Sequence, residues 1–333
     1  MPTVTEYCSN ALRGVVVAPR GRKLLVGDLA NIEGRGVAWL AGESWKLRAF
    51  ADADAGRGPD LYRLAYALAF NVSPESIDPH TVEGYFKRQI GKVIELMFSY
   101  GGGVGACLTG ADTYRIDLEV MAAACWPQFP RDIQIEAQQA WVWAVEQRRT
   151  FDLPPAIYRA CDGLKRVWRW TNPKITDFWP AMKNQVWAAL MQGGTRELGF
   201  LTFDTEAAWL CLRLPSGRYL CYPSPKLRDG QLTFLGTNPY TKQWGRLKTW
   251  GGTLTENATQ ALSRDVLAVG LLRAEVLGLN PVLHVHDEIV CEVPDTSDYS
   301  AAELEHCLTA PIPWAPGLPL AAKVFETDRY RKD

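Results

Sequence analysis

The 333-residue sequence lacks any Cys-x-x-Cys pair, although it contains eight cysteines. Because paired cysteines at that spacing are the usual signature of a zinc site, no zinc site is expected. The N-terminus shows no signal peptide, so the cysteines are expected to be buried free thiols in a reducing compartment. These absences predict a soluble, intracellular protein.

Long apolar runs and a large net charge are also missing. No apolar run reaches the length of a membrane span, so no membrane partner is expected. The formal net charge of -1 does not by itself indicate a nucleic-acid partner. A basic face that binds nucleic acid is still compatible with this charge, if the acidic residues collect on another part of the surface. The chain has no internal repeat and no low-complexity block.

Tryptophan is the residue that the chain has in excess, with 13 copies, many of them between Trp126 and Trp250. Tryptophans usually serve as large core anchors. They also form surfaces on which nucleic-acid bases stack. The sequence leaves both interpretations open.

Hydrophobic periodicity predicts strands toward both ends of the chain and helices in the middle. Strands are expected at residues 23–27, 198–203, 208–214, 218–222, 231–235, 281–285 and 289–293. Helices are expected at residues 31–41, 60–70, 81–100, 111–126, 133–149, 156–170, 176–191 and 254–277. This pattern is typical of an α+β fold with a helical insertion.

The run His286-Asp287-Glu288 lies between two β-branched segments, which predicts a tight reversal that carries two carboxylates and an imidazole. Asp28 ends another apolar strand and offers a further carboxylate, with the backbone carbonyl of Leu29 next to it. Two aspartates at two strand ends suit a two-metal site for phosphoryl transfer. Imidazole is a poor Mg²⁺ ligand, so the metal is assigned to Asp287 and not to His286. Alternatively, Asp28 is an ordinary helix cap.

A second group of residues follows a helical spacing. Arg88, Lys92, Leu96 and Tyr100 fall on one face of the predicted helix 81–100. Two cations and a phenol in this order suit a triphosphate and a base. A solvated basic face is the alternative.

A third group lies on the long helix before the reversal. The amides of Asn257 and Gln260 interrupt an otherwise apolar segment, where they could read sugar and base edges in a minor groove. They could equally be ordinary positions that face solvent.

Taken in chain order, these segments resemble the motifs of family A DNA polymerases, the DNA polymerase I-like enzymes. The matching segments are 28–43, 60–65, 88–101, 260–265 and 286–288. The residues at 236–246 and 249–257 look most like those of phage or prophage members of this family. The resemblance runs from about Lys23 to Val293. It implies an antiparallel-sheet palm with a large helical fingers part: an N-terminal arm and first palm part at 1–59, fingers at 60–195 with an insertion at about 103–170, and a second palm part at 196–333.

The resemblance also implies roles for individual residues. Two Mg²⁺ ions, which Mn²⁺ can replace, would be held by Asp28, Asp287 and the Leu29 carbonyl, with Glu288 supporting the cluster. Glu33 would wall off the 2′ position of the nucleotide and so exclude ribonucleotides. The triphosphate would be bound by Arg88 and Lys92, and Lys92 would also donate a proton to the leaving pyrophosphate.

Further residues would contact the nucleotide and the DNA. Tyr100 would stack near the template base, while Gln260 and His286 would contact the primer terminus and duplex. Asn257 and Arg246 are further expected DNA contacts. Leu96 departs from the family, which usually has an aromatic residue there, so the contact that stacks on the sugar is in doubt.

The resemblance therefore predicts a DNA-directed DNA polymerase, a nucleotidyltransferase that extends a primer-template with dNTPs in the host cytoplasm or nucleoid. No proofreading exonuclease and no thumb are evident. The cations Lys165, Arg166 and Arg169 of the insertion are expected to replace part of the thumb's grip through phosphate contacts, unless the insertion is purely structural. The alternative function is a DNA-binding polymerase subunit, active only with replication proteins that supply a thumb or exonuclease.

Overall fold

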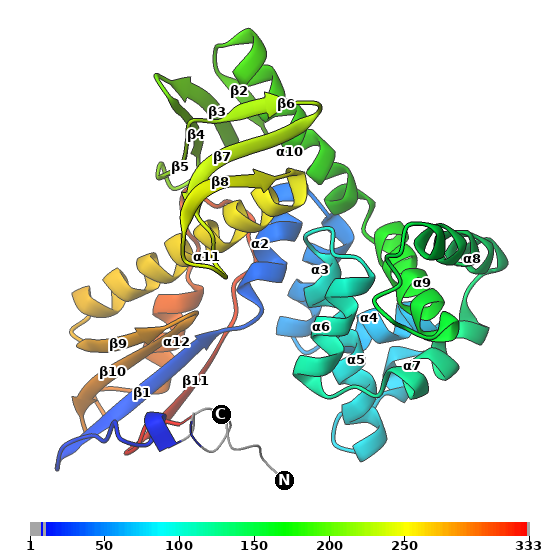
Figure 1. The fold of residues 1–333 in the computed structure, drawn as a ribbon. Coiled ribbons are helices and arrows are strands. Elements are labelled where there is room, and N and C mark those ends of the chain that lie inside the picture. The colour runs from blue at the N-terminus through cyan, green and yellow to red at the C-terminus, as the bar shows by residue number, and fades with distance from the viewer. Residues whose placement is uncertain (1–7, 9–10, 332–333) are drawn as a thin grey trace. The chain divides into compact units, whose positions relative to one another are not determined.

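The computed structural model describes residue 8 and residues 11–331 of the chain (Figure 1). The chain divides into two compact units. The first unit comprises the described residues of Met1–Gly36, together with Leu214–Arg218 and those of Thr259–Asp333, and the second comprises Val37–Arg213 and Tyr219–Ala258. These bounds differ from the three segments predicted above, whose palm and fingers division stays a prediction.

The first unit is built on a four-stranded antiparallel sheet in the order β11-β1-β10-β9. The strands are β1 (Arg22–Leu29), β9 (Pro281–Val285), β10 (Glu288–Pro294) and β11 (Ala322–Thr327). Helix α12 (Ala301–Thr309) covers one face, because a side chain at Gly27 would meet Leu304 and Leu308. The opposite face buries Leu24, Val26 and Val290 with Tyr330.

The second unit is largely helical. Its helices are α3 (Ser44–Asp54), α4 (Leu61–Phe70), α5 (Val82–Phe98), α6 (Val104–Tyr114), α7 (Leu118–Cys125), α8 (Arg131–Glu146), α9 (Pro155–Thr171) and α10 (Pro173–Gln192), with short 3₁₀ helices η1 (Pro74–Ser76) and η2 (Trp126–Gln128). Helices α2 (Ile32–Ala41) and α11 (Gly251–Val276) cross the boundary between the units. One continuous core, which includes Ile90, Phe98 and Trp168, joins the helices from α4 to α10.

Two small antiparallel sheets complete the second unit. One has the order β2-β3-β4-β5, with β2 (Arg196–Leu198), β3 (Leu201–Glu206), β4 (Trp209–Arg213) and β5 (Tyr219–Pro223). The other has the order β6-β7-β8, with β6 (Lys226–Arg228), β7 (Gln231–Thr237) and β8 (Trp244–Thr249). The α+β class and the antiparallel sheets predicted from the sequence are confirmed.

Local capping signals explain where the best-predicted helices begin. The Asp60 carboxylate accepts hydrogen bonds from the backbone amides of Tyr62 and Arg63, at 3.1 and 3.4 Å. The Thr81 hydroxyl accepts one from the amide of Gly84, at 3.0 Å. Each side chain satisfies amides that the first helical turn leaves without a backbone partner.

Other predictions of secondary structure were wrong. The expected helix 111–126 is two helices, α6 and α7, because Arg115 adopts a left-handed φ of 54° and Asp117 caps a new start. The expected strand 198–203 is the hairpin of β2 and β3, which turns at Gly199 with a φ of 57°. Strands β6, β8 and β11 and helices α3 and α12 were not predicted.

The cysteines and tryptophans follow the expected pattern in part. All eight cysteines are free, and six are buried, but Cys8 and Cys221 are exposed. Trp168 and Trp179 are buried and stack on each other, with ring centroids 6.2 Å apart, whereas Trp143, Trp170 and Trp244 are exposed. In the part of the chain that the structure describes, no helix is long and apolar enough to cross a membrane.

Helices α4 and α5 pack with almost no space at Gly91. A β-carbon there would lie 1.9 Å from the carbonyl oxygen of Tyr62, a backbone atom that cannot move by itself. Replacing glycine by alanine at a solvent-exposed position inside a helix stabilises the helix by about 1 kcal/mol. We expect Gly91→Ala to lower the free energy of unfolding instead, by about 1–3 kcal/mol, as overpacking does.

Urea unfolding measures this effect. The matched control is Gly105→Ala in α6, where the new β-carbon meets only the exposed ring of Phe151, 3.1 Å away. That ring can shift, so the control should unfold at or above the wild-type midpoint. Equal stability of the two variants would contradict the close helix contact.

Candidate active site

The hairpin of β9 and β10 brings its turn next to the end of β1. In the antiparallel register, Asp28 pairs with Glu288, and the amide of Leu29 donates a hydrogen bond to the carbonyl oxygen of Asp287, at 3.1 Å. Val285 pairs with Glu288, so His286 and Asp287 form the two-residue turn. Two segments that lie far apart in sequence therefore place Asp28 and Leu29, at the end of β1, next to the turn that carries Asp287.

Glu288 is not at the tip of the hairpin, as the sequence suggested. It begins β10, is only 7% exposed and accepts a hydrogen bond from the hydroxyl of Tyr330. Burial and the bond to Glu288 raise the pKa of Tyr330, so this phenol stays protonated. The prediction was wrong because a turn that reads as three residues closes with only two.

Three charged residues form one row across this sheet. Lys323 of β11 pairs with Asp28 on one side, and Glu288 pairs with Asp28 on the other. Residues that pair directly project from the same face of the sheet. Two opposed carboxylates repel each other, and Lys323 brings a positive charge to the same row.

The residues of the turn itself are accessible. His286 is exposed and adopts a left-handed φ of 56°, which a residue with a β-carbon rarely does. Its Nδ1 lies 3.1 Å from the carboxylate of Asp287, whose side chain is 30% exposed. A partly exposed carboxylate next to a residue with strained backbone is an arrangement that functional sites often keep.

The oxygen donors of this site match the preference of Mg²⁺. Asp28, Asp287 and the Leu29 carbonyl supply only oxygen, and Mg²⁺ is usually bound by one or two carboxylates plus waters and substrate phosphates. Among the described residues, no group of three or more His, Cys, Asp or Glu side chains is arranged to hold a metal by itself. A metal here would take its remaining oxygen ligands from water and substrate.

The two predicted triphosphate-binding residues, Arg88 and Lys92, lie on α5 in the second unit, where they contact aromatic rings. The Nε of Arg88 lies 3.1 Å from both carboxylate oxygens of Asp60, and its guanidinium carbon is 5.1 Å from the ring centroid of Tyr62. The ammonium of Lys92 is 4.7 Å from the ring centroid of Tyr114 and 5.9 Å from that of Tyr62. These contacts hold both cations in place.

Sequence reasoning missed these rings and also missed the contact between Arg88 and Asp60. Tyr62 lies on α4 and Tyr114 on α6, so no spacing along the sequence connects them to Lys92. Burial, and then Glu95, raise the pKa of Tyr62. The neutral ring is a suitable partner for a cation.

The remaining residues of the predicted site are placed less distinctly. Glu33 lies half-buried in the first turn of α2, and Leu96 and Tyr100 are half-buried at the end of α5 and just beyond it. Gln260 is exposed on α11, whereas the amide of Asn257 donates to the hydroxyl of Tyr222, at 3.1 Å. Their contacts with DNA or nucleotide stay predictions.

The three cations of the insertion are engaged within the protein. Lys165 and Arg166 both bind the buried carboxylate of Asp162, and Arg166 also binds Glu136. Arg169 donates to the carbonyl oxygens of Gly101 and Gly102, at 3.3 and 3.4 Å. Burial lowers the pKa of Lys165 and of Arg169. Their phosphate contacts stay a prediction, which these internal partners do not favour.

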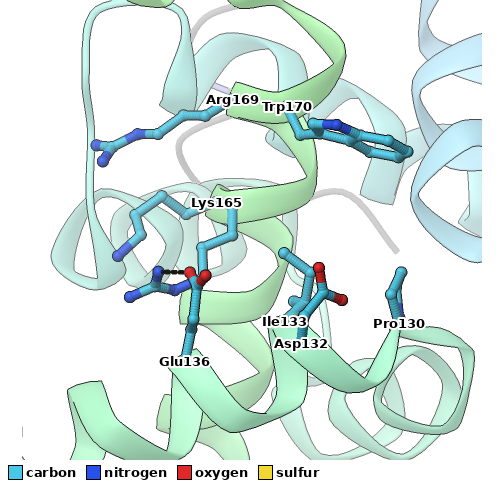
Figure 2. A pocket seen from close by; sticks show the side chains of 8 residues that line it. Pro130, Asp132, Ile133, Glu136, Lys165, Arg169 and Trp170 are labelled. Atoms are coloured by element: carbon cyan, nitrogen blue, oxygen red, sulfur yellow. Dashed lines mark hydrogen bonds and ion pairs between the residues drawn. The ribbon is translucent and has the colours of Figure 1, made fainter.

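A cavity of about 450 Å³ adjoins these cations. Its lining combines them with carboxylates and apolar side chains: Pro130, Asp132, Ile133, Glu136, Lys165, Arg166, Arg169 and Trp170 (Figure 2). Because both acidic and basic side chains line the cavity, its charge does not favour the binding of an anion.

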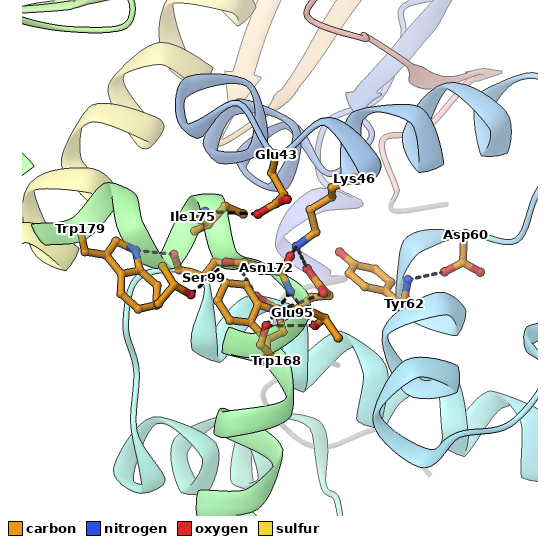
Figure 3. A network of polar contacts seen from close by, with 12 residues as sticks. Glu43, Lys46, Asp60, Tyr62, Glu95, Ser99, Trp168, Asn172, Ile175 and Trp179 are labelled. Atoms are coloured by element: carbon orange, nitrogen blue, oxygen red, sulfur yellow. Dashed lines mark hydrogen bonds and ion pairs between the residues drawn. The ribbon is translucent and has the colours of Figure 1, made fainter. Parts of the chain in front are cut away.

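A buried polar network holds Glu95, which lies seven residues after Arg88 and therefore on nearly the same face of α5. The ammonium of Lys46 lies 2.5 Å from the carboxylate of Glu95 and 2.9 Å from the side-chain oxygen of Asn172, and the indole of Trp168 donates to Glu95, at 3.1 Å (Figure 3). Glu43 accepts hydrogen bonds from the amides of Lys174 and Ile175, at 2.8 and 3.3 Å. The network thus connects α3, α5, α9 and α10.

Known proteins resemble this chain in sequence and in fold. No family model matches the sequence. The chain is 35% identical over 332 residues to a DNA polymerase of Bacillus phage SP02, and the match covers 98% of this chain and 44% of that protein. The resemblance to DNA polymerases that the motifs indicated is therefore confirmed over almost the whole chain.

A solved structure has a similar fold. The POL domain of Pol1 from M. smegmatis, in complex with DNA primer-template and dNTP, superposes with a TM-score of 0.54 at 17% sequence identity. The match covers 98% of this chain and 43% of that chain. The chain spans less than half the length of both relatives.

Removing one charge from the buried network should be costly. Lys46→Ala leaves the carboxylate of Glu95 buried without its cation, and such a change typically lowers the free energy of unfolding by about 3–5 kcal/mol. Denaturant unfolding of the two proteins measures the difference.

The control is Lys87→Ala, which breaks the ion pair with Glu83 on the surface of the same helix. It should leave the unfolding midpoint nearly unchanged, since exposed pairs contribute little. If Lys46→Ala also left the unfolding midpoint unchanged, the buried network would not contribute to stability.

Tyr330→Phe tests the support of Glu288. Loss of a hydrogen bond to a buried carboxylate should lower the free energy of unfolding by about 1.5–3 kcal/mol. The pKa of Tyr330 is raised above its unfolded value of about 10, so its contribution is complete below pH 10 and is lost as pH rises through the raised pKa.

The difference in stability between wild type and Tyr330→Phe should therefore shrink in alkaline solution, which unfolding curves at neutral pH and above pH 10 measure. A difference that stays constant with pH would mean that the hydroxyl does not act through its bond to Glu288.

Proposed function

We propose that this chain, a relative of DNA polymerases along nearly its whole length, is a template-directed DNA polymerase that adds deoxynucleotides to the 3′-hydroxyl of a primer. The observation that carries the proposal is the pairing of Asp28 with Glu288 at the start of β10, which brings Asp28 next to the turn that carries Asp287. The primer-template and dNTP of the M. smegmatis complex are the partners proposed for this chain.

In this proposal, Asp28, Asp287 and the Leu29 carbonyl hold Mg²⁺, and Mn²⁺ can replace it. The bound metal supplies positive charge that stabilises the attacking and leaving oxygens of the phosphoryl transfer. The oxygen-only donor set supports this assignment. Glu288, which Tyr330 holds, keeps the row of charges beside Asp28 in a fixed arrangement.

Arg88 and Lys92 bind the triphosphate of the incoming nucleotide. Arg88 can grip phosphate oxygens with several N–H groups, and Lys92 acts as a compact charge or proton donor. Their contacts with Asp60, Tyr62 and Tyr114 support the proposal, because side chains that are already ordered lose little entropy on binding. Glu33 excludes the 2′-hydroxyl of ribonucleotides, and Tyr100 stacks near the template base.

Primer extension by the purified chain tests this function. With a primer-template, dNTPs and Mg²⁺, the wild-type chain should extend the primer. Asp287→Ala should reduce the rate by about 1000-fold or more, since loss of electrostatic stabilisation of this kind costs several kcal/mol in the transition state.

The control is Asp298→Ala, which removes an exposed carboxylate from the same unit and should extend primers normally. Unfolding curves verify that both variants are folded. Full activity of Asp287→Ala would refute the assignment. No extension by the folded wild-type chain would favour a subunit that needs a partner.

A further inference from the structure

One face of the β6-β7-β8 sheet collects cations. In the antiparallel register, Lys226 pairs with Thr233 and Thr233 with Lys248, while Leu235 pairs with Arg246 and Thr237 with Trp244. Side chains two residues apart on a strand share a face. Five exposed residues therefore project from the same side of the sheet, here called the basic sheet face: Lys226, Arg228, Trp244, Arg246 and Lys248.

The opposite face of this sheet packs against protein. Leu232 is buried, and the ring of Phe234 meets that of Tyr222 edge-on, with centroids 5.0 Å apart. The sheet is thus anchored through its apolar side. The basic sheet face takes no part in this anchoring.

The charge of this segment differs from that of the chain as a whole. Residues 224–250 contain five cations, Lys242 among them, and a single carboxylate, Asp229, while the chain has a formal net charge of -1. In the described part of the chain, none of these five cations is paired with a carboxylate. Uncompensated positive charge on one surface is the usual signature of a phosphate-binding partner.

The central cation of the face is held in position. The Nη1 of Arg246 donates to the carbonyl oxygen of Ser224, at 3.0 Å, and to the hydroxyl of Thr233, at 3.2 Å. Both contacts are to neutral groups, so they orient the guanidinium and leave its charge uncompensated. Arg246 was predicted from the sequence as an isolated DNA contact, and the sheet surrounds it with three further cations.

Two exposed aromatic side chains accompany the cations. Trp244 is 65% exposed at the start of β8, and Tyr240 is 92% exposed in the turn that precedes it. That turn is ordered by Asn238, whose side-chain oxygen accepts hydrogen bonds from the amides of Tyr240 and Thr241, at 2.9 and 3.1 Å. Large aromatic rings that project into solvent from ordered backbone are suited to stack on a partner.

We propose that the basic sheet face binds single-stranded DNA, with its cations at the phosphates and with Trp244 and Tyr240 stacked on unpaired bases. Basic grooves combined with aromatic platforms are the general means of holding single strands without sequence preference. A duplex backbone would use the cations alone, because its bases are already stacked. The proposal rests on the proposed function in one respect, namely that the bound strand is the unpaired template.

Fluorescence anisotropy tests this binding. The full chain is titrated onto a labelled, unprimed thymidine oligonucleotide of about 16 nucleotides, without metal or dNTP. The triple variant Lys226→Gln, Arg246→Gln, Lys248→Gln should bind at least about tenfold more weakly. Its plot of log affinity against log salt should be shallower by about 2, since each lost phosphate contact removes about 0.7 on single strands.

A second variant separates stacking from charge. Tyr240→Ala with Trp244→Ala should also weaken binding by about tenfold or more, with the salt dependence unchanged. The matched control is Trp143→Ala with Arg149→Gln, an exposed aromatic and cation in contact elsewhere in the same unit, which should bind as wild type does. Unfolding curves establish that each variant is folded.

Unchanged affinity of the two test variants for the oligonucleotide would overturn the proposal. A second pattern would also overturn it: the charge variant loses as much affinity for blunt duplex DNA as for the oligonucleotide, and the aromatic substitutions have no effect. That pattern would indicate a surface that binds the backbone of duplex DNA. The outcome is independent of catalysis, because the titration contains neither metal nor dNTP. If wild type bound single strands through this face but failed to extend primers, only the proposed function would fail.

Discussion

The antiparallel pairing of β1 with β10 is the interaction on which the candidate active site depends. It sets Asp28 opposite Glu288 and brings Leu29 against Asp287. A slip of one residue in this register would turn Asp28 toward α12 and its apolar side chains, because successive residues of a strand project from opposite faces. The register is fixed by burial on both faces: Leu25 and Gly27 face α12, and Leu24 and Val26 face the cluster around Tyr330.

Helix α5 carries charged side chains of two kinds, which need different surroundings. Arg88 and Lys92 lie beside aromatic rings, and Glu95, seven residues after Arg88, is buried in an ion pair with Lys46. A buried ion pair contributes little net stability compared with apolar packing, but it tolerates few alternative arrangements. Together with the close contact at Gly91, this pair restricts how α5 can shift or rotate against α4 and α9. The position of the two cations therefore depends on contacts within the protein, at Gly91 and at the pair of Glu95 with Lys46.

Near-neutral overall charge conceals a strong local separation of charge. In the insertion, Asp162 and Glu136 neutralise Lys165 and Arg166. On the β6-β7-β8 sheet, no carboxylate among the described residues does the same for Arg246 and its neighbours. Two clusters that look equally basic in the sequence thus differ in the charge that they offer to a partner. Composition cannot reveal the difference, since it depends on which side chains the fold brings together.

The sequence by itself determined the fold class, most helices and the identity of the proposed catalytic carboxylates, because periodicity, caps such as Asp60 and motif order are local signals. It did not determine that α6 and α7 separate at Arg115, that Glu288 is buried beneath Tyr330, or that β11 adds Lys323 beside Asp28. Those features arise from contacts between distant segments, and only tertiary packing selects among the partners that each segment could have. The rings around Lys92 and the exposed face of β8 also depend on contacts between distant segments. These residues become neighbours only when the chain folds.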